Sequence, residues 1–213
     1  PYADNGLTLI PDSLDYEDVI MISCILPSGY FGAELAEIKP GDVVVVLGAG
    51  PVGCTTMMSG RLFGPAFIVA VDVIDERLEF AKKNGWCDVT VNPKTQDLDA
   101  IVKGLTDGRG ADSVIEVAGG HGTFDTAWQV ARPNGIVSLI AMYEEAQSLP
   151  LHQMYGKNLI FKTGGVDASH NDTLMKLIEG GKINCRPLIT HTMPLNDIMH
   201  GYEIFEKHLD GCV

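Results

Sequence analysis

Three glycines and one aspartate form the pattern in this sequence with the most specific chemical meaning. The apolar run Val43–Leu47 is followed directly by Gly48, Gly50 and Gly53, and Asp72 lies about 20 residues further on. A first glycine permits a tight turn off the strand, and a second lets a pyrophosphate approach the bare backbone. A carboxylate at the position of Asp72 accepts hydrogen bonds from ribose hydroxyls. The spacing therefore predicts a dinucleotide-binding site.

The residues after Gly50 suit the start of a helix that faces phosphate groups. Pro51 fits the first helical position, where its missing N–H would have no partner, and Val52 follows it. Free N–H groups and the positive end of the helix dipole favour anions there. Asp72 would repel a 2′-phosphate, so NAD is expected in preference to NADP, whereas a nearby arginine, Arg77, can accept such a phosphate. A helix-capping aspartate is the structural alternative for Asp72.

Composition limits the class of protein and its partners. The 213 residues are 46% hydrophobic and 20% charged, with a net charge of −13, which suits a globular chain and disfavours nucleic acids and anionic membranes. No apolar run reaches the length of a bilayer span. The cysteines show no paired CxxC spacing and indicate a reducing compartment, so a cytoplasmic location is expected. They are Cys24, Cys54, Cys87, Cys185 and Cys212.

Strand and helix patterns alternate along the middle of the chain. The predicted strands are Val43–Leu47, Phe67–Val71, Val89–Val91, Ser113–Val117, Ile136–Met142 and Leu159–Lys162. Helical patterns and short turns separate them, which predicts an α/β fold with a doubly wound six-stranded parallel sheet of the Rossmann type. Outside this block we expect short strands at Leu7–Ile10 and Arg186–His191, and a helix that ends before Pro27.

The carboxyl ends of parallel strands line the ligand crevice of such a sheet. Ala118 and Gly119 follow the fourth predicted strand, and Ile140 and Met142 end the fifth. Small residues at these points would allow a cofactor to come close. The six histidines lack metal-ligand spacing such as HxxxH or HExxH and suit the surface or helix ends, and only His121, just after the loop of the fourth strand, has a position that could bring it near a cofactor.

Several segments resemble the medium-chain, zinc-dependent alcohol dehydrogenases. They follow the family's order along essentially the whole chain and comprise Cys24–Tyr30, Gly48–Gly53, Ala70–Asp72, the glycine pair after Lys162, and Leu188–His191. Within the family, Pro27–Glu34 leans towards the formaldehyde-dehydrogenase-like and secondary-alcohol branches.

This resemblance implies a catalytic domain written in two parts around a dinucleotide-binding domain. Residues 1–26 would end the first catalytic part, residues 27–165 would form the Rossmann domain, and residues 166–213 would return to the catalytic domain. The family's two other zinc ligands, a cysteine and a histidine in a Gly-His-Glu setting, would lie upstream of this sequence, whose first histidine is His121. The chain is therefore expected to be a piece of a longer enzyme, with both outer parts truncated and without activity by itself.

The resemblance also implies the reaction and the roles of particular residues. Cys24 aligns with a zinc ligand, and Ser28 with the hydroxyl that receives the alcohol proton. Hydride would pass between a small alcohol or aldehyde and NAD, with zinc as the Lewis acid in the full-length parent and without zinc in this fragment. Arg77 would bond to the ribose hydroxyls, and the segments after the fourth and fifth strands would flank the adenosine and the nicotinamide. A homodimer or tetramer would form through nucleotide domains, around Leu159–Lys162.

Other functions remain open from the sequence. A zinc-free medium-chain reductase, of the quinone or enoyl type, shares the fold but does not require a cysteine at position 24. A nucleotide-binding module with regulatory rather than catalytic work would suit a sequence without an upstream histidine. A methyltransferase that uses S-adenosylmethionine can also hold a ribose with an acid after the second strand, although six strands in the dinucleotide arrangement argue against it. Without its family context, Cys24 would be interpreted as a small core residue.

Overall fold

The protein is described by a computed structural model that covers residues 6–167, 169–209 and 211–212. Parallel strands form one sheet in the order β3-β2-β1-β4-β5-β6, so the direction of the strand order reverses between β1 and β4. This arrangement confirms the predicted doubly wound α/β fold. The strands are β1 (Val43–Leu47), β2 (Phe67–Val71), β3 (Val89–Val91), β4 (Ala111–Glu116), β5 (Ala131–Leu139) and β6 (Ile160–Thr163).

The central strand β1 is buried along its whole length. Val45 pairs with Val69 of β2 on one side and with Val114 of β4 on the other. Alternate residues point to opposite faces of the sheet, so Val44 belongs to one core cluster and Val45 to the other. A continuous apolar strand is stable here because helices exclude water from both faces.

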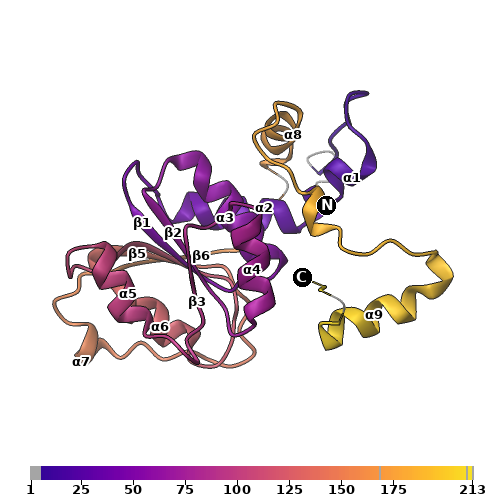
Figure 1. The fold of residues 1–213 in the computed structure, drawn as a ribbon. Coiled ribbons are helices and arrows are strands. Elements are labelled where there is room, and N and C mark those ends of the chain that lie inside the picture. Colours follow the sequence, from indigo (N-terminus) through magenta and orange to yellow (C-terminus); the bar gives the residue numbers. More distant parts are fainter. Residues whose placement is uncertain (1–5, 168, 210, 213) are drawn as a thin grey trace.

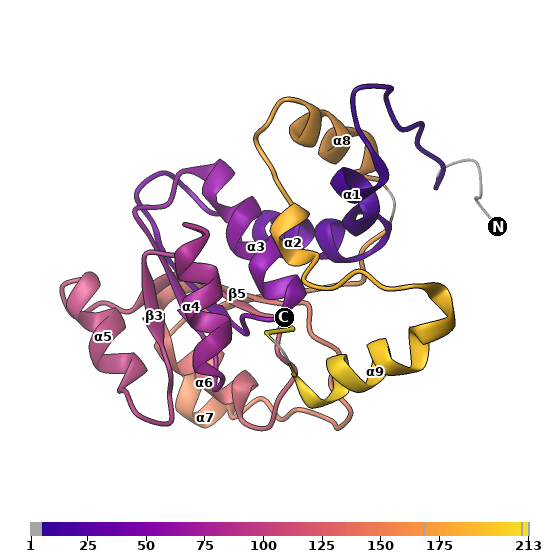
Figure 2. The same cartoon turned by 45° about the vertical axis from the view of Figure 1, so that its right-hand side comes forward.

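Helices cover the sheet in two layers, which Figure 1 and Figure 2 show from different directions. One layer shares a core cluster with the sheet and consists of α2 (Ile25–Leu35), α3 (Pro51–Gly60) and α4 (Asp75–Lys83). The opposite layer consists of α5 (Leu98–Leu105) and α6 (Thr123–Val130). A 3₁₀ turn, Arg61–Phe63, extends α3, and the short helix α7 (Leu151–Met154) precedes β6.

The segments before β1 and after β6 pack together beside α2. Helix α1 (Tyr16–Val19) continues into a 3₁₀ turn, Ile20–Ser23, and α8 (Asn171–Glu179) lies against both (Figure 2). Further along the chain come the 3₁₀ turns Arg186–Leu188 and Leu195–Asp197 and the helix α9 (Ile198–Lys207).

Arg186 joins these two outer segments through three carboxylates. Its guanidinium donates hydrogen bonds to Asp15, Glu17 and Asp18, all near the start of α1. The hydrogen bond from Arg186 lowers the pKa of Asp18 to about 2. Asp15 and Asp18 also form a capping box, in which each side chain accepts a backbone N–H of the other. The start of α1 is therefore fixed both by its own cap and by a residue from the far end of the chain.

Three predicted details of the outer segments are wrong. Arg186–His191 is not a strand but begins with a 3₁₀ turn, in which Pro187 has no N–H to offer a neighbouring strand. Leu7–Ile10 has no strand partner among the described residues. Pro27 does not end a helix: it lies in the first turn of α2, where a proline is tolerated. The predicted domain boundary after Leu26 falls within that same turn, and the division into domains stays a prediction.

Within the described ranges, no single helix is long and apolar enough to cross a membrane. The consecutive stretches Tyr16–Ser23 and Ile25–Leu35 pass such a test only when they are taken together, by length and composition, across a bend of 59°.

The turn from β1 into α3 depends on two glycines. Gly48 has a φ of +108°, which is strained for any residue with a side chain, and its N–H donates to the carbonyl of Val71 at 2.8 Å. A Cβ on Gly53 would overlap the carbonyl group of Gly48. The first turn of α3 therefore packs directly on the backbone that leaves β1, as the glycine motif predicts.

We predict that Gly53→Ala destabilises the fold by about 1–3 kcal/mol, because the added methyl group meets backbone that cannot move aside. Gly104→Ala is the matched control, since a Cβ there meets nothing within 4 Å, and it should stabilise α5 by up to about 1 kcal/mol. Urea unfolding of both variants measures the difference. Wild-type stability in Gly53→Ala would show that this close packing is unimportant.

Candidate nucleotide-binding site

A pocket of about 400 Å³ opens at the carboxyl ends of β1 and β4, where the strand order of the sheet reverses. Ligands of doubly wound sheets bind at this topological switch point. The predicted cofactor residues that line the pocket are Gly48, Gly50, Pro51, Val52, Gly53, Asp72, Arg77 and Ala118. The lining residues that the sequence did not single out are Val73, Ile74, Val117 and His208.

The glycine turn presents bare backbone to this pocket. Gly50 is the N-cap residue of α3 and its carbonyl accepts the N–H of Cys54 at 2.9 Å, which closes the first helical turn. The nearest atom to a Cβ built on Gly50 would be Nη1 of Arg77, 3.6 Å away. The N–H groups at the start of α3 have no partners within the helix. Together with the helix dipole, they make this end of the pocket suitable for a phosphate group.

Asp72 follows β2 and ties the glycine turn to the start of the next loop. Its Oδ2 accepts the N–H of Ala49 at 2.7 Å, and its Oδ1 accepts the N–H of Ile74 at 3.0 Å. The carboxylate is half-buried on the pocket wall. A carboxylate has about four acceptor positions, so Asp72 retains acceptor capacity for two hydroxyl groups while it holds the turn.

Arg77 brings a positive charge to the glycine turn from the first turn of α4. One of its terminal nitrogens, Nη2, lies 3.1 Å from Nδ1 of His208. Its Nε is buried and has no hydrogen-bond partner among the described residues. A guanidinium whose terminal Nη1 lies next to the bare backbone of Gly50 can bind either ribose hydroxyls or a phosphate. His208 comes from the C-cap of α9, 131 positions away in sequence, and no sequence pattern pointed to it.

Of the predicted residues after β4 and β5, only Ala118 lines the pocket, and the others are held by different contacts. Gly119 has a φ of +65°, and a Cβ on it would come within 2.7 Å of the Met142 carbonyl oxygen. The Ile140 side chain points to α2, where its Cδ1 would lie 2.5 Å from a Cβ on Gly32. The side chain of Met142 is 93% exposed. Gly119, Ile140 and Met142 are not among the residues that line the nucleotide pocket, so their contact with a cofactor stays a prediction.

Cys24 and Ser28 lie together at the start of α2 and do not line this pocket. The Ser28 hydroxyl donates to the Cys24 carbonyl oxygen at 2.8 Å, and the Cys24 thiol is free and exposed. Pro51 borders both the nucleotide pocket and a second, largely apolar pocket of about 390 Å³ that also contacts Ile25. The start of α2 is thus adjacent to the glycine turn.

A complete metal site is not formed by the residues that the structure describes. No group of three or more His, Cys, Asp or Glu side chains among them is placed to hold a metal ion. Catalytic zinc takes three protein ligands, so Cys24 alone does not fit a zinc ion here. His121 is exposed in the turn before α6 and lies outside the lining of the nucleotide pocket.

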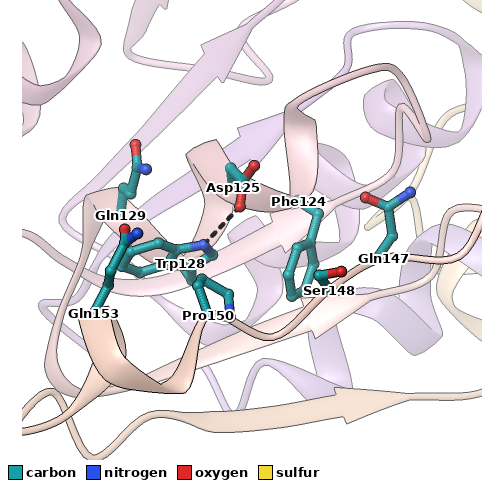
Figure 3. A pocket seen from close by; sticks show the side chains of 8 residues that line it. All are labelled: Phe124, Asp125, Trp128, Gln129, Gln147, Ser148, Pro150 and Gln153. Atoms are coloured by element: carbon teal, nitrogen blue, oxygen red, sulfur yellow. Dashed lines mark hydrogen bonds between the residues drawn. The ribbon is translucent and has the colours of Figure 1, made fainter.

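A further hollow of about 270 Å³ lies over α6 and contains none of the predicted site residues (Figure 3). Asp125 and Trp128 face each other in it, and the indole N–H donates to the aspartate at 3.1 Å. Three glutamines also border this hollow, namely Gln129, Gln147 and Gln153. Two of the residues that line it, Phe124 and Trp128, belong to one buried apolar cluster.

Comparisons with known proteins agree with this geometry. A family described as zinc-binding dehydrogenase matches residues 51–180. An alcohol dehydrogenase of Cupriavidus necator is 36% identical, with all of this chain and 59% of the relative covered. An NADP-dependent isopropanol dehydrogenase of Thermoanaerobacter brockii is 29% identical, with 96% of this chain and 58% of the relative covered.

The fold is also that of solved alcohol dehydrogenases. The structure of alcohol dehydrogenase TADH from Thermus sp. ATN1 superimposes with a TM-score of 0.92 at 30% identity, covering 98% of this chain and 60% of that one. The chain thus spans about three fifths of the length of these relatives. From the glycine turn, the switch-point pocket and these matches, we conclude that the chain belongs to the medium-chain zinc-dependent alcohol dehydrogenase family and contains its nucleotide-binding portion.

Proposed function

We propose that this chain provides the NAD-binding part of an enzyme that transfers a hydride between NAD and a small alcohol or aldehyde. The observation that carries the proposal is the bare-backbone turn at Gly48–Gly53, which opens into the pocket shared by β1 and β4 with Asp72 on its wall. The family relationship supplies the substrate class, since the named relatives include alcohol dehydrogenases.

Each part of the pocket has a distinct task in this proposal. The N–H groups at the start of α3 bind the pyrophosphate, and Asp72 accepts the hydroxyls of the adenosine ribose. The backbone after β4 and β5, at Ala118–Gly119 and Ile140–Met142, borders the nicotinamide half. When bound, NAD supplies the carbon that accepts the hydride. The protein orients that carbon and excludes water from it.

Asp72 and Arg77 decide between NAD and NADP. The Asp72 carboxylate disfavours a 2′-phosphate by charge repulsion, whereas the positive charge of Arg77 on the same pocket wall favours one. The carboxylate lies on the pocket wall and is already held by Ala49 and Ile74, so it cannot swing away from the ribose. We therefore propose NAD as the cofactor, although a relative in the family is named for NADP.

We predict that Asp72→Asn weakens NAD binding about tenfold or more, because a hydrogen bond to a charged group contributes about 1.5–3 kcal/mol. Asparagine has a single acceptor oxygen, which can still accept the N–H of Ala49 and so hold the glycine turn, while the hydrogen bond from Ile74 is lost. The affinity for NADP should fall less, since the repulsive charge is removed. Calorimetric titration of both nucleotides, at one salt concentration, measures the two changes.

Glu76→Gln is the control, because Glu76 lies exposed in the same first turn of α4 and does not line the pocket. It should leave both affinities unchanged. Thermal-shift measurements of the wild-type chain with NAD, NADP and S-adenosylmethionine test the broader assignment. Stabilisation by S-adenosylmethionine alone would contradict a dehydrogenase and support a methyltransferase.

We further propose that Cys24 is one zinc ligand of the whole enzyme and that Ser28 receives the alcohol proton there. The exposed thiol of Cys24 at the start of α2, next to the glycine turn, supports the first role. The Ser28 hydroxyl, held by the Cys24 carbonyl, lies one helical turn away. In the described part of the chain Cys24 has no companion ligands, so no step through zinc is derived from this structure.

We predict that the full-length enzyme contains about one zinc ion per catalytic site and that Cys24→Ser lowers this content and abolishes alcohol oxidation. Cys212→Ser is the control, as a further cysteine that is not fully buried, and it should keep the metal. Elemental analysis of the dialysed proteins gives the metal content directly. Full zinc content in Cys24→Ser would exclude the ligand role and leave a zinc-free reductase as the better assignment.

The proposed assembly is a homodimer or tetramer that pairs through the nucleotide domains. β6 forms an edge of the sheet, and edge strands offer unpaired backbone groups to a second copy. Leu149, Leu151 and Tyr155 are exposed and line a hollow of about 530 Å³ before the strand, and Ile160 is exposed on the strand itself.

A further inference from the structure

A carboxylate lies fully buried at the carboxyl end of β4, and the proposed function above gives it no role. Glu116 is the last residue of the strand, and its exposed fraction is 0%. Charged side chains are almost never buried to this extent unless they are paired or hydrogen-bonded. The donors that surround Glu116 therefore indicate what the carboxylate holds in place.

Three donors from two loops converge on this carboxylate. Its Oε1 accepts the backbone N–H groups of Ala118 and Gly119, each at 2.9 Å. Its Oε2 accepts the hydroxyl of Tyr143 at 2.5 Å. Burial, reinforced by the hydrogen bond to Glu116, raises the pKa of Tyr143, so the phenol remains a donor. One side chain thus joins the loop after β4 to the loop after β5.

The backbone joins the same two loops. The N–H groups of Ile140 and Ala141 donate to the carbonyl oxygen of Glu116 at 3.1 and 3.2 Å. Gly119 approaches the Met142 carbonyl so closely that a Cβ would lie 2.7 Å from it. The separation of the two loops is therefore set by Glu116 on one side and by the lack of a side chain on Gly119 on the other.

The two halves of a dinucleotide lie over the two halves of a doubly wound sheet. Asp72, after β2, serves the adenosine half, so the ends of β4 and β5 face the nicotinamide half. We propose that Glu116, acting through Ala118, Gly119 and Tyr143, is a positioning residue for the nicotinamide half of the cofactor. This inference rests on the proposed function, because it requires a nicotinamide dinucleotide in the pocket.

The opposite end of β4 offers a matched control. Asp112 is also a buried carboxylate and lies on the same face of the strand, four residues before Glu116. It accepts the backbone N–H of Val43 at 2.9 Å and the Nε–H of Arg132 at 2.6 Å. These partners lie at the end of the sheet away from the pocket. Asp112→Asn therefore disturbs a buried carboxylate of β4 without changing the two loops.

The test compares NADH with AMP, which contains only the adenosine half of the cofactor. Calorimetric titration is carried out on the wild-type chain, Glu116→Ala and Asp112→Asn. We expect Glu116→Ala to weaken NADH binding about 10- to 100-fold, because several buried donors lose their acceptor. AMP affinity should fall less than NADH affinity, because Ala118 also lines the pocket whereas Gly48–Gly53, Asp72 and Arg77 are unchanged. Asp112→Asn should leave both affinities within about twofold of wild type.

Two further variants separate positioning from a general loss of structure. In Glu116→Gln the amide oxygen can accept the N–H groups of Ala118 and Gly119, and the amide nitrogen can donate to the Tyr143 oxygen. We expect this variant to recover most of the NADH affinity. Tyr143→Phe keeps the ring and loses one hydrogen bond, so it should show a smaller loss for NADH and none for AMP. This milder variant tests the positioning role if Glu116→Ala does not fold.

The possible failures are distinct. Unchanged NADH affinity in Glu116→Ala, or an equal loss of NADH and AMP affinity, overturns the positioning role of Glu116. In the second case the residue supports the fold as a whole. If the wild-type chain binds neither NADH nor NAD, the proposed function fails instead.

Discussion

The arrangement of the whole chain depends on one place where two stretches of backbone meet without side chains between them. Gly53, in the first turn of α3, packs directly on the carbonyl group of Gly48, where the chain leaves β1. This contact aims the free N–H groups of the helix at the crevice between β1 and β4. The remaining strands are added outward on both sides of β1, and the loops at their carboxyl ends gather around the same crevice. A steric constraint on two residues thereby determines where a ligand can bind.

The central part of the fold could be predicted from the sequence because its signals are local. The unbroken run Val43–Leu47 indicates a strand covered on both faces, and the glycine motif fixes the turn after it. The outer segments gave weaker signals. Arg186–Leu188 resembles a strand by composition, yet its structure is decided by Pro187 and by the ion pairs of Arg186 with the start of α1. Those partners lie far away in the sequence, so no local pattern reveals them.

The candidate site likewise combines residues that local sequence patterns indicate with residues that only long-range contacts bring together. Asp72 and Arg77 belong to the βα unit that follows the glycine motif, and both line the pocket, as the spacing of Asp72 and the nearness of Arg77 predict. Glu116 could not be recognised, because a glutamate at the end of a strand is ordinarily an exposed residue. Its importance comes from Tyr143, 27 positions away. His208 reaches the pocket from α9, and Cys24 would need ligands that the described residues do not supply. Contacts between residues far apart in the sequence cannot be predicted from local sequence patterns.

The ion pairs of Arg186 have a consequence for how this chain can be rearranged in evolution. Arg186 contacts Asp18 although 168 positions of sequence separate them. All six strands of the sheet lie between these two residues in the sequence, so the segments before and after the sheet are close together in space. A unit whose two ends meet in this way can be inserted into another protein, or exchanged for a related unit, with little strain on the connecting segments. The hydrogen bonds from the guanidinium to its three carboxylates then hold together the two segments between which the sheet is inserted.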